Sequence, residues 1–309
     1  MPDRKPGEAV LLMGYGAPQG PEDLPGFLRE VLGRPPSPAL VEEYRRRYEL
    51  IGWSPQLRII QSLRQRLEDR FTGVGSPRRV LLGTKHWTPH VADAVRQAAD
   101  EGIRRLVAIP LSPFASPWVL RPYQRELETG RSAASHPIAV ELRAGWHRSK
   151  ALARFWADEL RSLPRSDHDG SVVFLTAHSL PERHRRSGDP YPEIIGEMVQ
   201  EVVREADLKG WEFTYQSAGN TTEPWLGPDV RERMQVWAEK GAKDQWIASL
   251  GFLFDHLEVL YDLDVVVRAF AEEHGIRYHR LPQPNDDPRV VEALQEVADA
   301  PSWPLPVAV

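Results

Sequence analysis

The sequence predicts an α/β protein with two Rossmann-like lobes, each a four-stranded parallel sheet flanked by helices. Eight short aliphatic or β-branched runs alternate with longer segments of helical spacing. The runs fall into two groups of four, with the same order of elements in each half of the chain. Runs that are apolar throughout suit strands covered by helices on both faces, which is the usual setting of a parallel sheet.

The elements follow in order along the chain. Strands are expected at 9–14, 80–83, 106–111 and 138–142, and then at 171–176, 212–216, 245–250 and 276–279. Helical spacing is clearest at 39–71 and 229–239. A cluster of turn-forming residues at 162–170 marks the expected joint. We therefore expect lobes at 9–165 and 170–285, with a last helix at about 287–300 that packs back on the first lobe.

The composition excludes several classes of protein. A chain of 309 residues, 41% hydrophobic and 27% charged, can build a core in each lobe. It has no apolar run of membrane-spanning length, and residues 1–8 lack the apolar region of a signal peptide, so we expect a cytoplasmic monomer without a membrane anchor. The net charge of −5 argues against a general nucleic-acid binder.

The chain contains no cysteine. Disulfides, thiolate zinc sites and cysteine-ligated iron–sulfur clusters are therefore excluded, and any metal must be bound through nitrogen or oxygen. We expect no tightly bound cofactor.

In open α/β sheets, ligands bind beyond the carboxyl ends of the strands. The residues that follow the predicted strands are unusually polar or aromatic: Tyr15, Lys85, His86, Ser112, Phe114, Trp146, His178, Ser179, Ser217, Asn220, Asp255 and Glu258. A Gly-x-Gly surrounds Tyr15, but Pro18 follows it and the third glycine is missing, so dinucleotide binding is poorly supported.

Two of these positions are candidates for catalysis. His178 directly follows a buried run, although a lone histidine there is also compatible with a structural role. Asp255, Glu258 and Asp262 are spaced i, i+3, i+7, which predicts one acidic stripe on a helix. The stripe could be a solvated face, but apolar residues 250–254 precede it and place its start at a buried cleft. Together with His178 it would form a nitrogen and oxygen site for a divalent metal, consistent with Fe²⁺ but not selective for it.

Aromatic residues gather near the same strand ends: Trp53, Phe114, Trp118, Tyr123, Trp146, Trp225 and Phe252. Most suit a core, but Trp118 and Trp225 stand beside prolines in predicted loops. A flat apolar macrocycle needs a mostly apolar cleft with a few placed polar groups. Its carboxylates could meet Arg29, Arg34, Arg47 and Ser54.

The motifs resemble those of ferrochelatases, in order, from about Val10 to Leu294. The similarity is strongest to the soluble ferrochelatases of Gram-positive bacteria, which act on coproporphyrin III. The matching segments are Tyr15-Gly16-x-Pro18, Arg47-Tyr48-Glu49-x-Ile51-Gly52, Ser54-Pro55, Lys85-His86, Ala177-His178-Ser179-Leu180-Pro181, Gly188-Asp189-Pro190-Tyr191, Gln216-Ser217-x-Gly219-Asn220-Thr221, Pro224-Trp225-Leu226-Gly227-Pro228 and Asp255-His256-Leu257-Glu258.

The resemblance implies roles for individual residues. His178 and Glu258 would act on the metal and the pyrrole protons, and Tyr15 would lie on the opposite face of the porphyrin. The expected substrate-binding residues are Tyr15, Arg47, Tyr48, Ser54, His86, Tyr123, Ser217 and Trp225. The chain departs from the family pattern at Val31 and Leu32, where relatives often have an arginine pair, and at Val266, where some continue the acidic stripe.

These expectations define a mechanism and its competitors. Neutral His178 would accept a pyrrole proton or hand over Fe²⁺, while Glu258 and Asp262 relay charge outward. Coproporphyrin III is favoured over protoporphyrin IX. A related cobalt or nickel chelatase acting on a sirohydrochlorin-type ring remains an alternative, as does a porphyrin or haem carrier, although a carrier would have no need of the two acidic residues.

Overall fold

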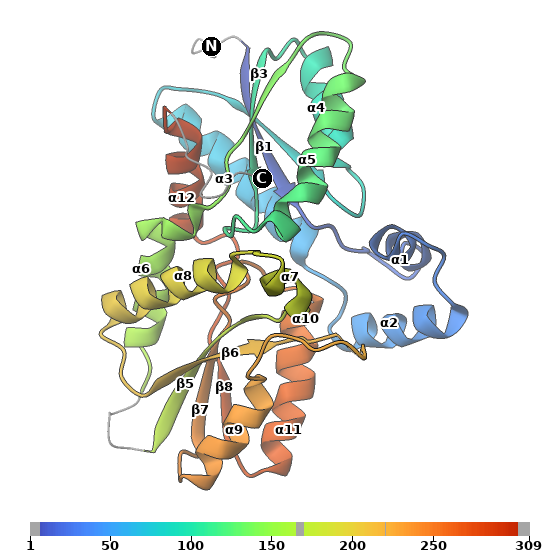
Figure 1. The fold of residues 1–309 in the computed structure, drawn as a ribbon. Helices are drawn as coiled ribbons and strands as arrows, with labels where there is room; N and C mark the ends of the chain where they lie inside the picture. Colours follow the sequence, from blue (N-terminus) through green and yellow to red (C-terminus); the bar gives the residue numbers. More distant parts are fainter. Residues whose placement is uncertain (1–6, 165–169, 220, 302–309) are drawn as a thin grey trace. The chain divides into compact units, whose positions relative to one another are not determined.

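The computed structural model describes residues 7–164, 170–219 and 221–301 (Figure 1). The chain divides into two compact units, with boundaries between Trp146 and His147 and between Pro284 and Asn285. Unit 1 therefore contains the first strands together with the last helix, and unit 2 is the segment between them. In the segments described, no helix is both long and apolar enough to cross a membrane.

Unit 1 is built on a parallel sheet with the strand order β2-β1-β3-β4. Its strands are β1 (Glu8–Gly14), β2 (Arg79–Thr84), β3 (Arg105–Pro110) and β4 (Ala139–Leu142). Its helices are α1 (Leu24–Leu32), α2 (Pro38–Leu50), α3 (Gln56–Gly73), α4 (Val91–Asp100), α5 (Pro117–Ser132) and α12 (Pro288–Asp299), and a short 3₁₀ turn (Trp146–Arg148) spans the boundary to unit 2.

Helices cover both faces of this sheet (Figure 1). Ala9, Leu11 and Met13 of β1 pack in one core cluster with α4 and α5. Val10 and Leu12 are also fully buried, and because side chains alternate along a strand they point to the other face. On that side α3 packs against β2, and α12 packs against α3 and β3.

The helical pattern predicted over 39–71 is split into α2 and α3. Gly52 and Trp53 both have left-handed backbones, with φ of 68° and 66°. Pro55 disfavours a helical conformation for the residue before it. The α2 helix therefore ends, and α3 begins after Pro55.

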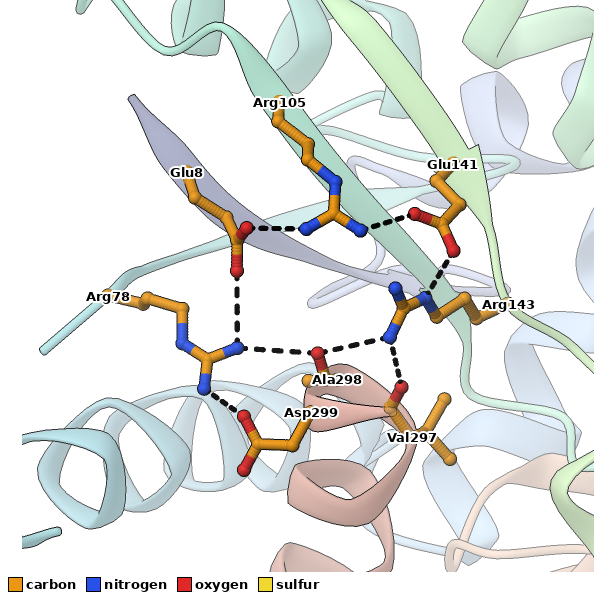
Figure 2. Close-up of polar contacts among 8 residues, drawn as sticks. All are labelled: Glu8, Arg78, Arg105, Glu141, Arg143, Val297, Ala298 and Asp299. Carbon is orange, nitrogen blue, oxygen red and sulfur yellow. Dashed lines mark hydrogen bonds and ion pairs between the residues drawn. The ribbon is translucent and has the colours of Figure 1, made fainter. Parts of the chain in front are cut away.

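Two buried arginines attach α12 to the sheet (Figure 2). The Arg143 Nη1 donates to the carbonyl oxygens of Val297 and Ala298, at 2.7 and 3.1 Å, and the Arg78 Nη1 donates to the Ala298 oxygen at 3.3 Å. The side chains of Arg143 and Arg78 are only 1% and 2% exposed. Their charges lie at the helix C-terminus, where the helix dipole favours cations.

Carboxylates complete this arginine network (Figure 2). Arg78 pairs with Glu8 and Asp299, and Arg143 pairs with Glu141. Arg105 bridges Glu8 and Glu141 at 2.6 and 2.7 Å. We call these six residues, with Val297 and Ala298 contributing carbonyls, the arginine network.

Unit 2 repeats the architecture around a parallel sheet with the order β6-β5-β7-β8. The strands are β5 (Ser171–His178), β6 (Trp211–Gln216), β7 (Asp244–Ala248) and β8 (Arg277–Arg280). Its α-helices are α6 (Lys150–Arg161), α7 (Glu182–Arg186), α8 (Tyr191–Ala206), α9 (Val230–Glu239), α10 (Leu257–Leu260) and α11 (Arg268–Glu273). A π-helical turn, Asp262–Val267, separates α10 from α11.

The fold class predicted from the sequence is confirmed, because both sheets are four-stranded and parallel throughout. The unit boundary differs from the predicted joint at 162–170. Helix α6 packs against α8 and so belongs to unit 2, which moves the boundary to the start of that helix. Turn-forming residues mark the end of α6 just as they would mark a linker. Residues 165–169 of the predicted joint lie outside the described residues.

Candidate active site

His178 is the last residue of β5, and both its ring and its backbone make polar contacts with neighbouring residues. Its Nδ1 contacts the carbonyl oxygen of Ser179. A carbonyl can only accept a hydrogen bond, so Nδ1 carries a proton, and in the neutral tautomer of the ring the lone pair is on Nε2. The Tyr191 hydroxyl donates to the His178 carbonyl at 3.1 Å, and burial raises the pKa of Tyr191, which keeps that hydroxyl protonated.

Aromatic rings surround the His178 imidazole. The Phe252 ring lies edge-on to it with centroids 5.9 Å apart, and Trp225 lies at 6.5 Å. The Trp225 Nε1 donates to Thr221 at 2.8 Å. Gly219 lets this ring approach, since a Cβ there would stand 2.5 Å from the Trp225 Cζ2. The wall beside His178 is therefore apolar and fixed.

The Phe252 ring also contacts His256, with centroids 4.6 Å apart. The His256 Nδ1 donates to the Phe254 carbonyl at 2.8 Å, and its Nε2 lies 3.3 Å from the Glu258 Oε2. The Nε2 and Oε2 atoms are thus neighbouring groups that can each accept a proton.

Gln216 ties the strand ends to the Glu258 backbone. Its side chain is buried, and its Oε1 accepts from Thr176 at 2.5 Å and from Ser249 at 2.8 Å. Its Nε2 donates to the Glu258 carbonyl at 3.1 Å. One amide therefore joins β5, β6, the end of β7 and α10. We call His178, Gln216, Phe252, His256 and Glu258 the unit 2 site.

The corresponding strand ends of unit 1 form a second polar and aromatic group. Tyr15 follows β1 and is 39% exposed. The His86 ring lies edge-on to it at 4.7 Å, and the Lys85 Nζ lies 5.1 Å from its ring centre. Burial lowers the pKa of Lys85 to about 8. Burial, with the neighbouring Lys85 and His90, lowers the pKa of His86 to about 4, so this imidazole is neutral near pH 7.

The chain matches the ferrochelatase family model over residues 7–301. It is 36% identical to the coproporphyrin III ferrochelatase of Anoxybacillus flavithermus, over 93% of this chain and 94% of that protein. This chain belongs to the ferrochelatase family. It is also 33% identical to the ferrochelatase of Deinococcus radiodurans, over 94% of each protein. The family membership predicted from the sequence motifs is confirmed.

Solved structures extend the likeness to the fold. SirB from Bacillus subtilis with Fe³⁺ superposes with a TM-score of 0.58 at 11% identity, covering 94% of this chain and 96% of that one. CbiX, a terminal enzyme of siroheme biosynthesis in denitrifying bacteria, gives a TM-score of 0.54 at 16% identity, over 95% and 99%. At these identities the likeness concerns the two-lobed chelatase fold alone.

Within this member of the ferrochelatase family, the predicted acidic stripe is not one helical face. Asp255 precedes the helix, and His256 between it and Glu258 has an extended backbone, with φ of −159° and ψ of −174°. Asp262 begins the π-helical turn. Over the described ranges, no three His, Asp or Glu side chains gather as a bound metal would require. Spacing alone assumed an uninterrupted α-helix, and the helix is only four residues long.

Three of the predicted substrate-binding residues have clear structural roles. Tyr48 is 3% exposed and stacks on Trp53 at 5.5 Å. The Ser54 hydroxyl accepts from the Gln56 amide at 3.3 Å. Tyr123 lies in the core between the sheet and α5, and this burial raises its pKa. An aromatic residue on a helix gives the same sequence signal whether it faces a core or a ligand.

Two further residues predicted to bind substrate, Arg47 and Ser217, lie at or just beyond the ends of a helix and a strand. Arg47 pairs with Glu43 on α2 and is 31% exposed, and Ser217 follows β6 with a φ of 59°. Leu32 is exposed at the end of α1, between the exposed Arg29 and Arg34. Asn220 lies outside the described residues. The binding roles of these side chains stay predictions.

Three members of the unit 2 site were not singled out from the sequence. Phe252 was one of several aromatic residues near strand ends, and Gln216 and His256 appeared only within longer motifs. A histidine two residues before the key glutamate was the available signal. It became informative only once the extended backbone at His256 turned its ring toward the Glu258 carboxylate.

Proposed function

We propose that this protein is a ferrochelatase, a lyase that inserts Fe²⁺ into coproporphyrin III. The observation that carries the proposal is the unit 2 site, in a chain whose family membership is established. The His178 Nε2 lone pair and the His256–Glu258 pair both border the Phe252 ring. They offer several proton acceptors next to an apolar wall suited to a flat macrocycle.

Metal insertion removes two pyrrole protons and most of the water on Fe²⁺. Neutral His178 accepts a pyrrole proton or passes the metal through Nε2. The second pyrrole proton passes to Glu258 or His256, whose Oε2 and Nε2 lie 3.3 Å apart and can each accept a proton. Gln216 fixes the backbone of Glu258 while this happens. Fe²⁺ is the substrate, and we expect a monomer with no resident cofactor.

Coproporphyrin III is the proposed substrate because several relatives are named coproporphyrin III ferrochelatases. It bears four carboxylates, whereas protoporphyrin IX bears two. The exposed guanidinium groups of Arg29 and Arg34 flank the Val31-Leu32 position where relatives often have arginines. They are the candidates to bind the propionates in place of that arginine pair.

The test is anaerobic incubation of Fe²⁺, Co²⁺ or Ni²⁺ with one of three rings, coproporphyrin III, protoporphyrin IX or sirohydrochlorin, following the loss of ring fluorescence. We expect the fastest insertion with coproporphyrin III. Equal rates on the two porphyrins would contradict the substrate assignment. Activity only with Co²⁺ or Ni²⁺ on sirohydrochlorin would overturn the proposed function, and tight porphyrin binding without insertion would favour a carrier.

A further inference from the structure

The helix that carries Glu258 cannot hold its own position. Helix α10 is four residues long, and so short a helix is not stable through its backbone alone. The residue before it is extended, and the turn after it is π-helical. The position of the Glu258 carboxylate must therefore be set by contacts from neighbouring elements.

Arg280, the last residue of β8, supplies such contacts on both sides of α10. Its Nε and Nη2 donate to the two carboxylate oxygens of Asp264, at 2.7 and 2.8 Å, inside the π-helical turn. The same Nη2 lies 3.4 Å from the Asp255 Oδ1, three residues before Glu258. Its Nη1 donates to the carbonyl of Leu281 at 3.1 Å, which anchors the guanidinium to the strand end.

Because the Arg280 ion pairs are mostly buried, we expect their removal to be costly. The Arg280 side chain is 13% exposed, while Asp255 and Asp264 are 22% and 26% exposed. Surface ion pairs contribute little, but a mostly buried bidentate pair leaves an uncompensated charge when one partner is removed. A lysine cannot replace the geometry, since its single ammonium does not form a planar fork.

The Arg280–Asp264 contact lies in a π-helical turn, which is an unusual local structure. The Val266 amide bonds to the Tyr261 carbonyl at 3.0 Å, five residues back, as in a π-helix. Such turns are rare and are frequently found at functional sites. Asp264 lies within this turn, so its pairing with Arg280 fixes the turn next to α10.

We propose that Arg280 is a positioning residue for Glu258, which it holds by fixing Asp255 on one side of α10 and Asp264 on the other. Gln216 holds the same helix through the Glu258 carbonyl from the sheet side. Arg280 acts through these residues and not on the porphyrin. The inference rests on the proposed function, because it assigns Glu258 a role in metal insertion.

The test compares Arg280→Gln and Arg280→Lys with the matched control Arg277→Gln. Arg277 lies on the same strand and forms a bidentate pair with Asp244, but at the other end of β8. For Arg280→Gln we expect kcat for Fe²⁺ insertion to fall on the order of 10- to 100-fold, with the KM for porphyrin within about threefold. Arg280→Lys should recover only part of the rate, and Arg277→Gln should keep it.

A second measurement does not depend on activity. Amide hydrogen exchange should accelerate over 256–267 in Arg280→Gln and stay unchanged there in Arg277→Gln. Equal kcat in all variants, or unchanged exchange over that segment, would overturn the positioning role. Wild-type protein that inserts no Fe²⁺ would instead defeat the proposed function, and the exchange data would still decide whether Arg280 fixes α10.

Discussion

The arginine network of unit 1 and the unit 2 site both place charged groups at the ends of a parallel sheet, but they use them differently. In the network, each carboxylate faces a guanidinium (Figure 2), and Arg78 and Arg143 are buried against the end of α12. In the unit 2 site, Glu258 faces a histidine, and the backbone bonds are made by the Nδ1 atoms of His178 and His256. Each carboxylate of the network therefore faces a permanently charged group, whereas the Glu258 carboxylate faces a group that can gain or lose a proton.

The comparison predicts that removing His178 abolishes activity while sparing stability. His178→Ala should lower the rate of Fe²⁺ insertion on the order of 10²- to 10⁴-fold, because a positioned acid–base group is removed. The thermal midpoint should change little, since the side chain is only partly buried at a strand end. The measurement is fluorescence loss alongside thermal unfolding. A near wild-type rate would make His178 a structural residue.

Glu258→Gln should separate binding from chemistry. The amide keeps the shape of the side chain but carries no negative charge and cannot take up a proton. Porphyrin affinity, measured by tryptophan quenching, should stay within about tenfold, or roughly 1.4 kcal/mol. Insertion should fall on the order of 10²-fold or more. Asp262→Asn, in the π-helical turn, is the control and should affect the rate less. An equal loss of insertion rate in both variants would contradict the assignment of Glu258, and not Asp262, as the group that acts on the pyrrole protons.

Arg143→Met should give the opposite pattern to His178→Ala. The Val297 carbonyl loses its buried donor and Glu141 loses a cation, so we expect a loss of about 2 to 4 kcal/mol in the free energy of unfolding. The kcat and KM of the remaining folded protein should not change. Urea unfolding measures the loss. Arg131→Met, which removes an exposed pair with Glu128, should change stability by less than about 1 kcal/mol.

Lys85→Met should stabilise the protein in a pH-dependent way. Burial lowers the folded-state pKa from 10.5 to about 8, so below pH 8 the charge is present in both states and weakens the folded one. Between pH 8 and 10.5 only the unfolded chain binds the proton, and wild-type stability rises. The variant should therefore gain up to about 3 kcal/mol at pH 7, and this gain should disappear towards pH 10.5. Urea unfolding at a series of pH values measures the gain, and the exposed Lys240→Met should show no such trend.

The sequence predicted the fold more completely than the site. All eight strands were located, and β1, β3 and β5 gave the clearest signal because they are nearly continuous buried apolar runs. His178 and Glu258 were singled out as polar residues that follow apolar runs, and their roles stay predictions. The geometry around Glu258 was not predictable, because a four-residue helix, an extended His256 and a π-helical turn give the same i, i+3, i+7 spacing as a regular helix. Arg280 is distant in sequence from Asp264 and gave no local signal.

Unit 1 is interrupted in sequence by the whole of unit 2, and this affects the order of assembly during translation. The strands and helices up to Trp146 leave the ribosome well before α12, which supplies part of the cover over β3. Arg78 and Arg143 must meanwhile remain hydrated, because the Val297 and Ala298 carbonyls that they bind do not yet exist. Unit 2, whose chain is continuous, has all of its elements by Pro284. We therefore expect the second unit to be able to mature first, and nascent unit 1 to be the segment that depends on chaperones until its last helix docks.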